Sequence, residues 1–447
     1  MINWLRIFFK PAGAISIERT EDEVKKTFNR LRWSVFLSAT FGYGLYYVCR
    51  LSLNVIKKPL INGGYLTESQ LGIIGSTLFF SYAVGKLVNG FLADRSNIKR
   101  FMATGLLVSA LINLALGFTS SFLLFAILWG INGWFQSMGA TPAIISITRF
   151  FSNRERGTYY GLFSASHNIG EAITFIATAF LVTVLGWRWG FWGAGIIGLS
   201  GVVLISFFLH DSPQSKGLPS AAAYKKDEVP VITKDKSVGS VQLEVLKNPF
   251  IWILALSSAF MYVSRYAVNS WGMLFLETHK GYTTINASFI ISISSISGIV
   301  GNIISGLISD KFFKGKRNVP ALLFGILNAF SLTLFLFNPA GNLWIDMVSM
   351  VIFGMATGVL ICFLGGLMAV DIASKKAAGT AVGIVGIASY IGAAIQDIVS
   401  GSFIQTNKTV VNGVANYDFT SISYLWIGSS VISFLLALLV WNAKAKD

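Results

Sequence analysis

Three basic side chains, Arg50, Lys86 and Arg265, lie in stretches that are otherwise apolar enough to cross a membrane. A cation at the centre of a bilayer costs at least roughly 2.5–3.5 kcal/mol, so each of them needs an anionic partner or a polar path. Acids are scarcer in the same stretches, where Glu171 and Asp397 are the clear examples. This excess of positive charge predicts a cavity that binds an anion.

Tyrosines accompany both arginines at helical spacing. Tyr46 and Tyr47 precede Arg50 by four and three residues, so the three side chains share one broad helix face. Two guanidinium groups that face each other across a cavity are suited to the paired oxygens of a phosphate. The alternative is that each arginine neutralises a buried acid or reaches the membrane surface. The other predicted cavity residues of this kind are Tyr262, Tyr266, Asn269 and Tyr390.

Three further side chains are candidates for the same cavity. Lys86 is either a third cation or the partner of an acid near Asp94. His167 either donates to the anion, with an ordinary pKa near 6.5, or packs as a structural histidine. Glu171 is expected to pair with His167 or Lys86 and tune the charge, or to couple transport to a proton, or simply to be paired structurally. Asp397 is expected to be structural.

The composition identifies a membrane protein. The chain has 447 residues, of which 54% are hydrophobic and 12% charged, about half the charged fraction of soluble domains. Apolar runs long enough to span a bilayer recur along the whole length. We predict twelve spans, at 34–57, 71–93, 101–118, 121–148, 158–185, 189–209, 249–275, 285–310, 319–337, 342–369, 377–404 and 419–443.

The net charge of +15 reflects membrane topology rather than nucleic-acid binding. The two termini and the loops on their side carry 27 of the 35 Lys and Arg residues, and the opposite loops carry 5. By the positive-inside rule, both termini are predicted to be cytoplasmic. A bacterial inner membrane is the expected location, with the protein working as a monomer.

The two halves of the chain resemble each other. Gly90–Arg95 and Gly306–Lys311 share a Gly-x-x-x-Asp-basic pattern at an offset of 216, and Arg50 and Arg265 differ by 215. This indicates a parallel repeat, with a binding site between two bundles that alternately opens to each side. The fold class is therefore an all-α membrane protein with two pseudo-symmetric six-helix bundles. The predicted gate residues are Asp94, Arg95, Asp310 and Lys311.

A polar linker separates the halves at 210–248. The predicted organisation is a cytoplasmic segment at 1–33, a first bundle at 34–209, the linker, a second bundle at 249–443 and a tail at 444–447. The cytoplasmic segments contain no phosphate-binding glycine loop, metal-spaced His/Cys cluster or nucleophile triad. We therefore expect no enzymatic activity, no cofactor and no metal.

Several segments resemble the major facilitator superfamily and, more narrowly, the organophosphate:phosphate antiporter family. The resemblance covers almost the whole chain. It rests on Gly42–Arg50, Ser81–Lys86, Asp94–Asn97, Asn132–Gly139, Ser166–Gly170, Tyr262–Tyr266, Asn338–Gly341 and Lys375–Gly379.

This resemblance implies exchange of a phosphorylated sugar, or of glycerol-3-phosphate, against inorganic phosphate. It assigns the phosphate to Arg50 and Arg265, and places Lys86, His167 and Trp134 in the cavity. The chain departs from the family where Glu171 replaces a common glycine. A hexose phosphate such as glucose-6-phosphate is the favoured substrate. The alternatives are a glycerol-3-phosphate antiporter, a transporter-like sensor of hexose phosphate and a proton-coupled carrier of another solute.

Overall fold

Long helices make up most of the computed structural model, which describes residues 7–152, 155–225, 227, 238–313, 317–373, 377–411, 414–441 and 443. A single two-stranded sheet occurs in this part of the chain. Its antiparallel strands β1 (Lys408–Val411) and β2 (Val414–Tyr417) form a hairpin between the last two long helices.

The first half contains six spans, two of which are broken helices. The breaks lie between α5 and α6 at Ser137–Gly139, and between α7 and α8 at Ala165. The helices of this half are α2 (Glu21–Asn62), α3 (Glu68–Asp94), α4 (Ile98–Leu116), α5 (Phe122–Gln136), α6 (Ala140–Phe150), α7 (Arg156–Ser164), α8 (Ser166–Leu185) and α9 (Trp187–Phe208).

The second half also contains six spans, of which two contain a π-helical turn and a third is followed directly by one. The short segments before this half are η1 (Gln214–Lys216), α10 (Ala221–Lys225) and α11 (Val238–Lys247). The helices of the second half are α12 (Pro249–Tyr266), η2 (Ala267–Trp271), α13 (Gly272–Thr278), α14 (Thr284–Leu307), η3 (Ile308–Phe312), α15 (Asn318–Phe337), α16 (Leu343–Cys362), η4 (Phe363–Leu367), α17 (Met368–Ile372), α18 (Ala378–Thr406) and α19 (Thr420–Leu439).

Each predicted span falls on one of these helices or on consecutive helices joined end to end, so the twelve-helix fold is confirmed. Within the described residues, eleven helices are long and apolar enough to cross a membrane. The twelfth span lies in α2, which has 42 residues and contains Arg50 and several tyrosines. These polar side chains lower the hydropathy of α2, which is why it is not among the eleven. A capping box starts this helix, because Thr20 and Glu23 satisfy each other's backbone N–H groups.

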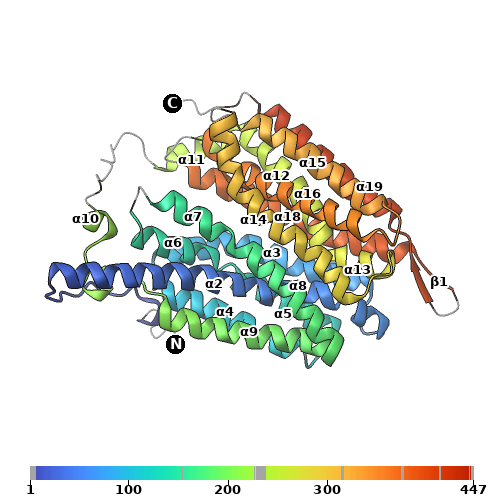
Figure 1. The fold of residues 1–447 in the computed structure, drawn as a ribbon, viewed down its shortest axis with the longest axis horizontal. Coiled ribbons are helices and arrows are strands. Elements are labelled where there is room, and N and C mark those ends of the chain that lie inside the picture. Colours follow the sequence, from blue (N-terminus) through green and yellow to red (C-terminus); the bar gives the residue numbers. More distant parts are fainter. Residues whose placement is uncertain are drawn as a thin grey trace.

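The two halves lie side by side, with both termini at one end of the bundle and the hairpin at the other (Figure 1). We call these the termini end and the hairpin end. Across the boundary, α3 packs on α18 and α8 packs on α14. The α3–α18 approach needs glycine, since a Cβ on Gly72 would clash with the backbone carbonyl of Asp397. The division of the chain at 210–248 stays a prediction.

The hairpin end is tied together across the two halves. Glu68 of α3 accepts hydrogen bonds from Lys408 at 2.8 Å and from Tyr417 at 2.6 Å. Lys58 donates to the carbonyl of Glu277 at 3.3 Å. Among the described residues, every side-chain hydrogen bond between the halves lies at the hairpin end or in the middle of the bundle.

Candidate functional site

Arg50 is buried at the middle of α2 in a setting of aromatic rings. Its side chain is 3% exposed, and its Nη2 donates to the hydroxyl of Tyr266 from the other half at 3.3 Å. The guanidinium carbon lies 4.4 Å from the ring centre of Tyr82 and 5.2 Å from that of Tyr390. These distances fit cation–π contacts. Within the described chain no carboxylate pairs with Arg50, and its Nε makes no hydrogen bond.

Arg265 lies at the matching position of α12 but has an acidic partner. Its Nη2 is 3.5 Å from Oε2 of Glu171, which belongs to α8 in the first half. Asn269, one turn after Arg265, donates to the other carboxylate oxygen of Glu171. All three side chains are buried. The expectation that Glu171 pairs with His167 or Lys86 was therefore wrong, because the carboxylate crosses between the halves instead.

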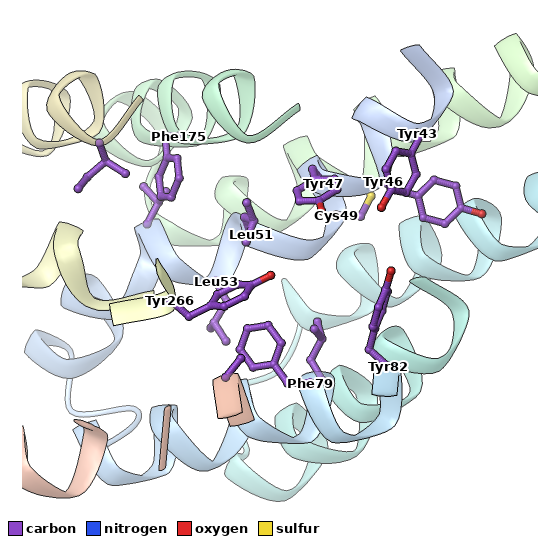
Figure 2. Packing of buried hydrophobic residues seen from close by; sticks show 14 of the residues in the cluster. Tyr43, Tyr46, Tyr47, Cys49, Leu51, Leu53, Phe79, Tyr82, Phe175 and Tyr266 are labelled. Carbon is purple, nitrogen blue, oxygen red and sulfur yellow. The ribbon is translucent and has the colours of Figure 1, made fainter. Parts of the chain in front are cut away.

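Tyr266 connects the two arginines. Its hydroxyl accepts from Arg50, and its ring centre lies 5.4 Å from the guanidinium carbon of Arg265. Figure 2 shows Tyr266 beside Phe79 of the first half, and their ring centres are 4.5 Å apart. The π-helical turn η2 begins directly after Tyr266 and carries Asn269. Such turns often occur at functional sites, because they re-aim side chains within a continuous helix.

The space beside Arg265 is small. A cavity of about 20 Å³, bordered by Arg265, Glu171, Asn269 and Asn168, leads toward α14 and α16. This volume is that of one bound water, not of a phosphate group. A phosphate group therefore does not fit beside Arg265 while Glu171 keeps this position.

Lys86 and His167 lie at the edge of the cluster of aromatic rings around Arg50, and both are half-buried. Nζ of Lys86 is 5.6 Å from the ring centre of Tyr390. It also approaches α18 closely, 2.8 Å from where a Cβ on Gly386 would stand. The ring of His167 lies 5.8 Å from that of Tyr47. Tyr262 joins the same cluster, with its ring centre 5.7 Å from the guanidinium carbon of Arg265.

Two predicted cavity residues make their described hydrogen bonds away from the arginines. The hydroxyl of Tyr46 donates to the carbonyl of Met102 on α4 at 2.5 Å, so this side chain packs inside the first half. Trp134 is half-buried on α5, and its carbonyl accepts from Asn89 at 3.2 Å. Among the described residues no hydrogen bond or ring contact joins the Trp134 side chain to either arginine.

The predicted gate residues lie at the termini ends of their helices. Asp94 ends α3 and Arg95 caps it, and both side chains are exposed. Lys311 is exposed on η3, and the side chain of Asp310 lies outside the described part of the chain. Neither Asp94 nor Arg95 forms an ion pair with a described residue. Their gating role stays a prediction.

Sequence reasoning missed a buried cation that lies between the halves. Lys57 falls at the end of a predicted span, yet its side chain is 1% exposed, and its Nζ lies 3.6 Å above the ring of Trp271. The indole N–H of Trp271 donates to Asp397 at 2.8 Å. This cluster joins α2 of the first half to η2 and α18 of the second. The expected structural role of Asp397 agrees with this contact.

The fold and this buried polar site define a multi-pass membrane transporter rather than an enzyme. The model of the Major Facilitator Superfamily matches residues 36–396. The chain belongs to this superfamily.

Proteins similar to the chain cover nearly its full length. A probable hexose phosphate transport protein of Chlamydia pneumoniae is 36% identical over 98% of both chains. The membrane sensor protein UhpC of Salmonella typhimurium is 30% identical over 87% of this chain and 89% of its own. A glycerol-3-phosphate transporter of Haemophilus influenzae is 30% identical over 98% and 97%. Among solved structures, the nucleoside transporter NupG matches in fold, with a TM-score of 0.72 at 15% identity over 92% of this chain and 100% of its own.

Proposed function

We propose that the protein exchanges a sugar phosphate for inorganic phosphate by alternating access. One observation carries the proposal. Two buried arginines, one from each half, contact the same tyrosine in the middle of the bundle, and Arg50 has no carboxylate partner in the described chain. A phosphate placed between Arg50 and Arg265 would receive charge-assisted hydrogen bonds from both halves at once.

Binding would change the contacts that hold the halves together. In the state described here the cross-half hydrogen bonds lie at the hairpin end and in the middle, which corresponds to an inward-facing carrier if the termini are cytoplasmic. A phosphate that displaces Glu171 from Arg265 would replace one cross-half bond by another. If the phosphate binds the two states with different affinity, its binding would shift the equilibrium between them. Asp94, Arg95, Asp310 and Lys311 would stabilise the opposite, outward-facing state at the termini end.

Hexose-6-phosphate is the favoured substrate. The Chlamydia relative, described as a hexose phosphate transporter, matches at higher identity than the glycerol-3-phosphate transporter. Tyr47, Tyr262, Tyr390 and Asn269 offer hydroxyl and amide groups near the arginines for a sugar ring, and Lys86 and His167 lie at its edge. Glycerol-3-phosphate is the second candidate, and the similarity to UhpC keeps a sensor role as a third.

The deciding experiment is exchange in phosphate-loaded proteoliposomes. Labelled phosphate should leave when glucose-6-phosphate is added outside, and more slowly when glycerol-3-phosphate is added. Arg50→Ala and Arg265→Ala should each abolish exchange, whereas Lys26→Ala, at an exposed position of α2, should keep it. Normal exchange by both arginine variants would refute the proposal. A wild-type protein that binds hexose phosphate without counterflow would be a sensor.

A further inference from the structure

A second cavity lies far from the arginines, at the termini end of the first half between α2 and the end of α9. Its volume is about 570 Å³. Four of its lining side chains are basic or imidazole groups, and two are large aromatic rings. They are Arg19, Arg30, His210, Lys216, Phe207 and Phe208.

Among the described residues that line this cavity there is no acid. In the described part of the chain, none of Arg19, Arg30 and Lys216 pairs with a carboxylate, and Nη1 of Arg19 is buried without a hydrogen bond. The acid next to His210 along the chain, Asp211, is already occupied. Its carboxylate accepts from the backbone N–H groups of residues 12 and 98 at 2.8 and 2.9 Å and from an arginine of α6 at 2.8 Å.

The pKa of His210 depends on the same positive charges. Burial and the positive charges of Lys216, Lys99 and Arg30 lower its pKa to about 4. The imidazole is therefore neutral at pH 7, and the cavity holds fixed cations. An anion in the cavity would oppose these charges and raise the pKa of His210.

The two aromatic rings place the cavity at the membrane surface. Phe207 and Phe208 end the apolar span α9, and their side chains are 72% and 53% exposed. Trp33, one turn beyond Arg30 on α2, is 49% exposed. Exposed apolar residues on a spanning helix face acyl chains, and tryptophan concentrates at the headgroup level. The basic groups thus begin where the lipid-facing surface ends.

We propose that this cavity binds the headgroup of an anionic phospholipid. Arg19, Arg30 and Lys216 would contact the phosphodiester, and Phe207 and Phe208 would lie against the first part of the acyl chains. Basic pockets beside spanning helices on the cytoplasmic side are suited to such headgroups. A free phosphate ester would use the same cations but would gain nothing from the exposed rings.

The test titrates dioctanoyl phosphatidylglycerol into the full chain in an uncharged detergent and counts bound lipid by native mass spectrometry. Dioctanoyl phosphatidylcholine and soluble glycerol phosphate are the comparison probes. The double variant Arg30→Gln/Lys216→Gln should bind phosphatidylglycerol roughly 25-fold more weakly, about fivefold for each charge lost. The matched control is Lys25→Gln/Lys26→Gln, which removes the same charge from exposed positions of α2 outside the cavity and should bind normally.

A second measurement uses the wild-type protein, so it does not depend on how the variants fold. The pKa of His210, followed by NMR, should rise when phosphatidylglycerol is added and stay unchanged with phosphatidylcholine. Equal binding of both lipids, or wild-type binding by the cavity variant, would overturn the proposal. Displacement of the lipid by glycerol phosphate at equal concentration would identify a soluble phosphate site instead. Arg265→Ala should bind the lipid normally, which separates this proposal from the transport site.

Discussion

Replacing Glu171 by glutamine should make the protein bind phosphate more tightly. In the described state the carboxylate of Glu171 contacts Asn269 and also Arg265, the side chain that a phosphate would contact. The ligand has to break these contacts first. A hydrogen bond to a charged group contributes about 1.5–3 kcal/mol, and the 3.5 Å separation places the Arg265 contact at the weak end. About 1.5 kcal/mol corresponds to roughly tenfold tighter binding.

The assay is equilibrium binding of labelled phosphate to purified protein at pH 7. Asp397→Asn is the matched control, because it neutralises another buried carboxylate of the spans, one that contacts Trp271 rather than an arginine. Its phosphate affinity should stay close to that of the wild type.

A double-mutant cycle separates competition from a general change in charge. In an Arg265→Ala background, Glu171→Gln should no longer improve binding, because the contact that it releases is absent. Wild-type or weaker affinity of the single variant would refute the reasoning. So would an equal gain with and without Arg265.

Three further changes test other contacts of the protein. Arg50→Lys keeps the charge but loses the planar fork, and exchange in proteoliposomes should fall by at least about tenfold. Tyr266→Phe removes only the hydroxyl that accepts from Arg50, so the KM for phosphate should change by no more than about fivefold while the protein stays folded by thermal unfolding. Glu68→Gln weakens the contacts with Lys408 and Tyr417 that join the two halves, which should destabilise closure of the hairpin end by about 1.5–3 kcal/mol. Maleimide labelling of a cysteine introduced at Ser69, which contacts Gln405 there, should then become faster, and unchanged labelling would contradict this role.

The spans and the arginine pair could be predicted because their signals are local or repeated. An apolar run of about 20 residues identifies a span wherever it packs. Arg50 and Arg265 stand out because a charge in such a run is rare and the two positions are related by the internal offset. Their common contact with Tyr266 agrees with that prediction.

The partner of Arg265 could not be predicted for a physical reason. Pairing between Glu171 and Arg265 depends on how deep α8 sits relative to α12, and no residue pattern within one helix encodes that relative position. The spacing along one helix can be read from the sequence, so His167, one turn before Glu171, was predicted as its partner instead of Arg265. Lys57 was missed because the end of a span resembles a loop, although α2 continues to Asn62 and buries the side chain.

The cross-half position of Glu171 also bears on why the protein would exchange rather than simply release phosphate. The carboxylate joins α8 to Arg265 and Asn269 of the other half, so reorientation from the described state would have to break this buried contact. A bound phosphate would take over both arginines and free Glu171. Inorganic phosphate and a sugar phosphate carry the same headgroup, so either would serve. Glu171→Gln should therefore allow phosphate to leave loaded vesicles without any phosphate ester outside. If the variant keeps a strict requirement for external substrate, the Glu171 contact is not what makes the exit of phosphate depend on the entry of a phosphate ester.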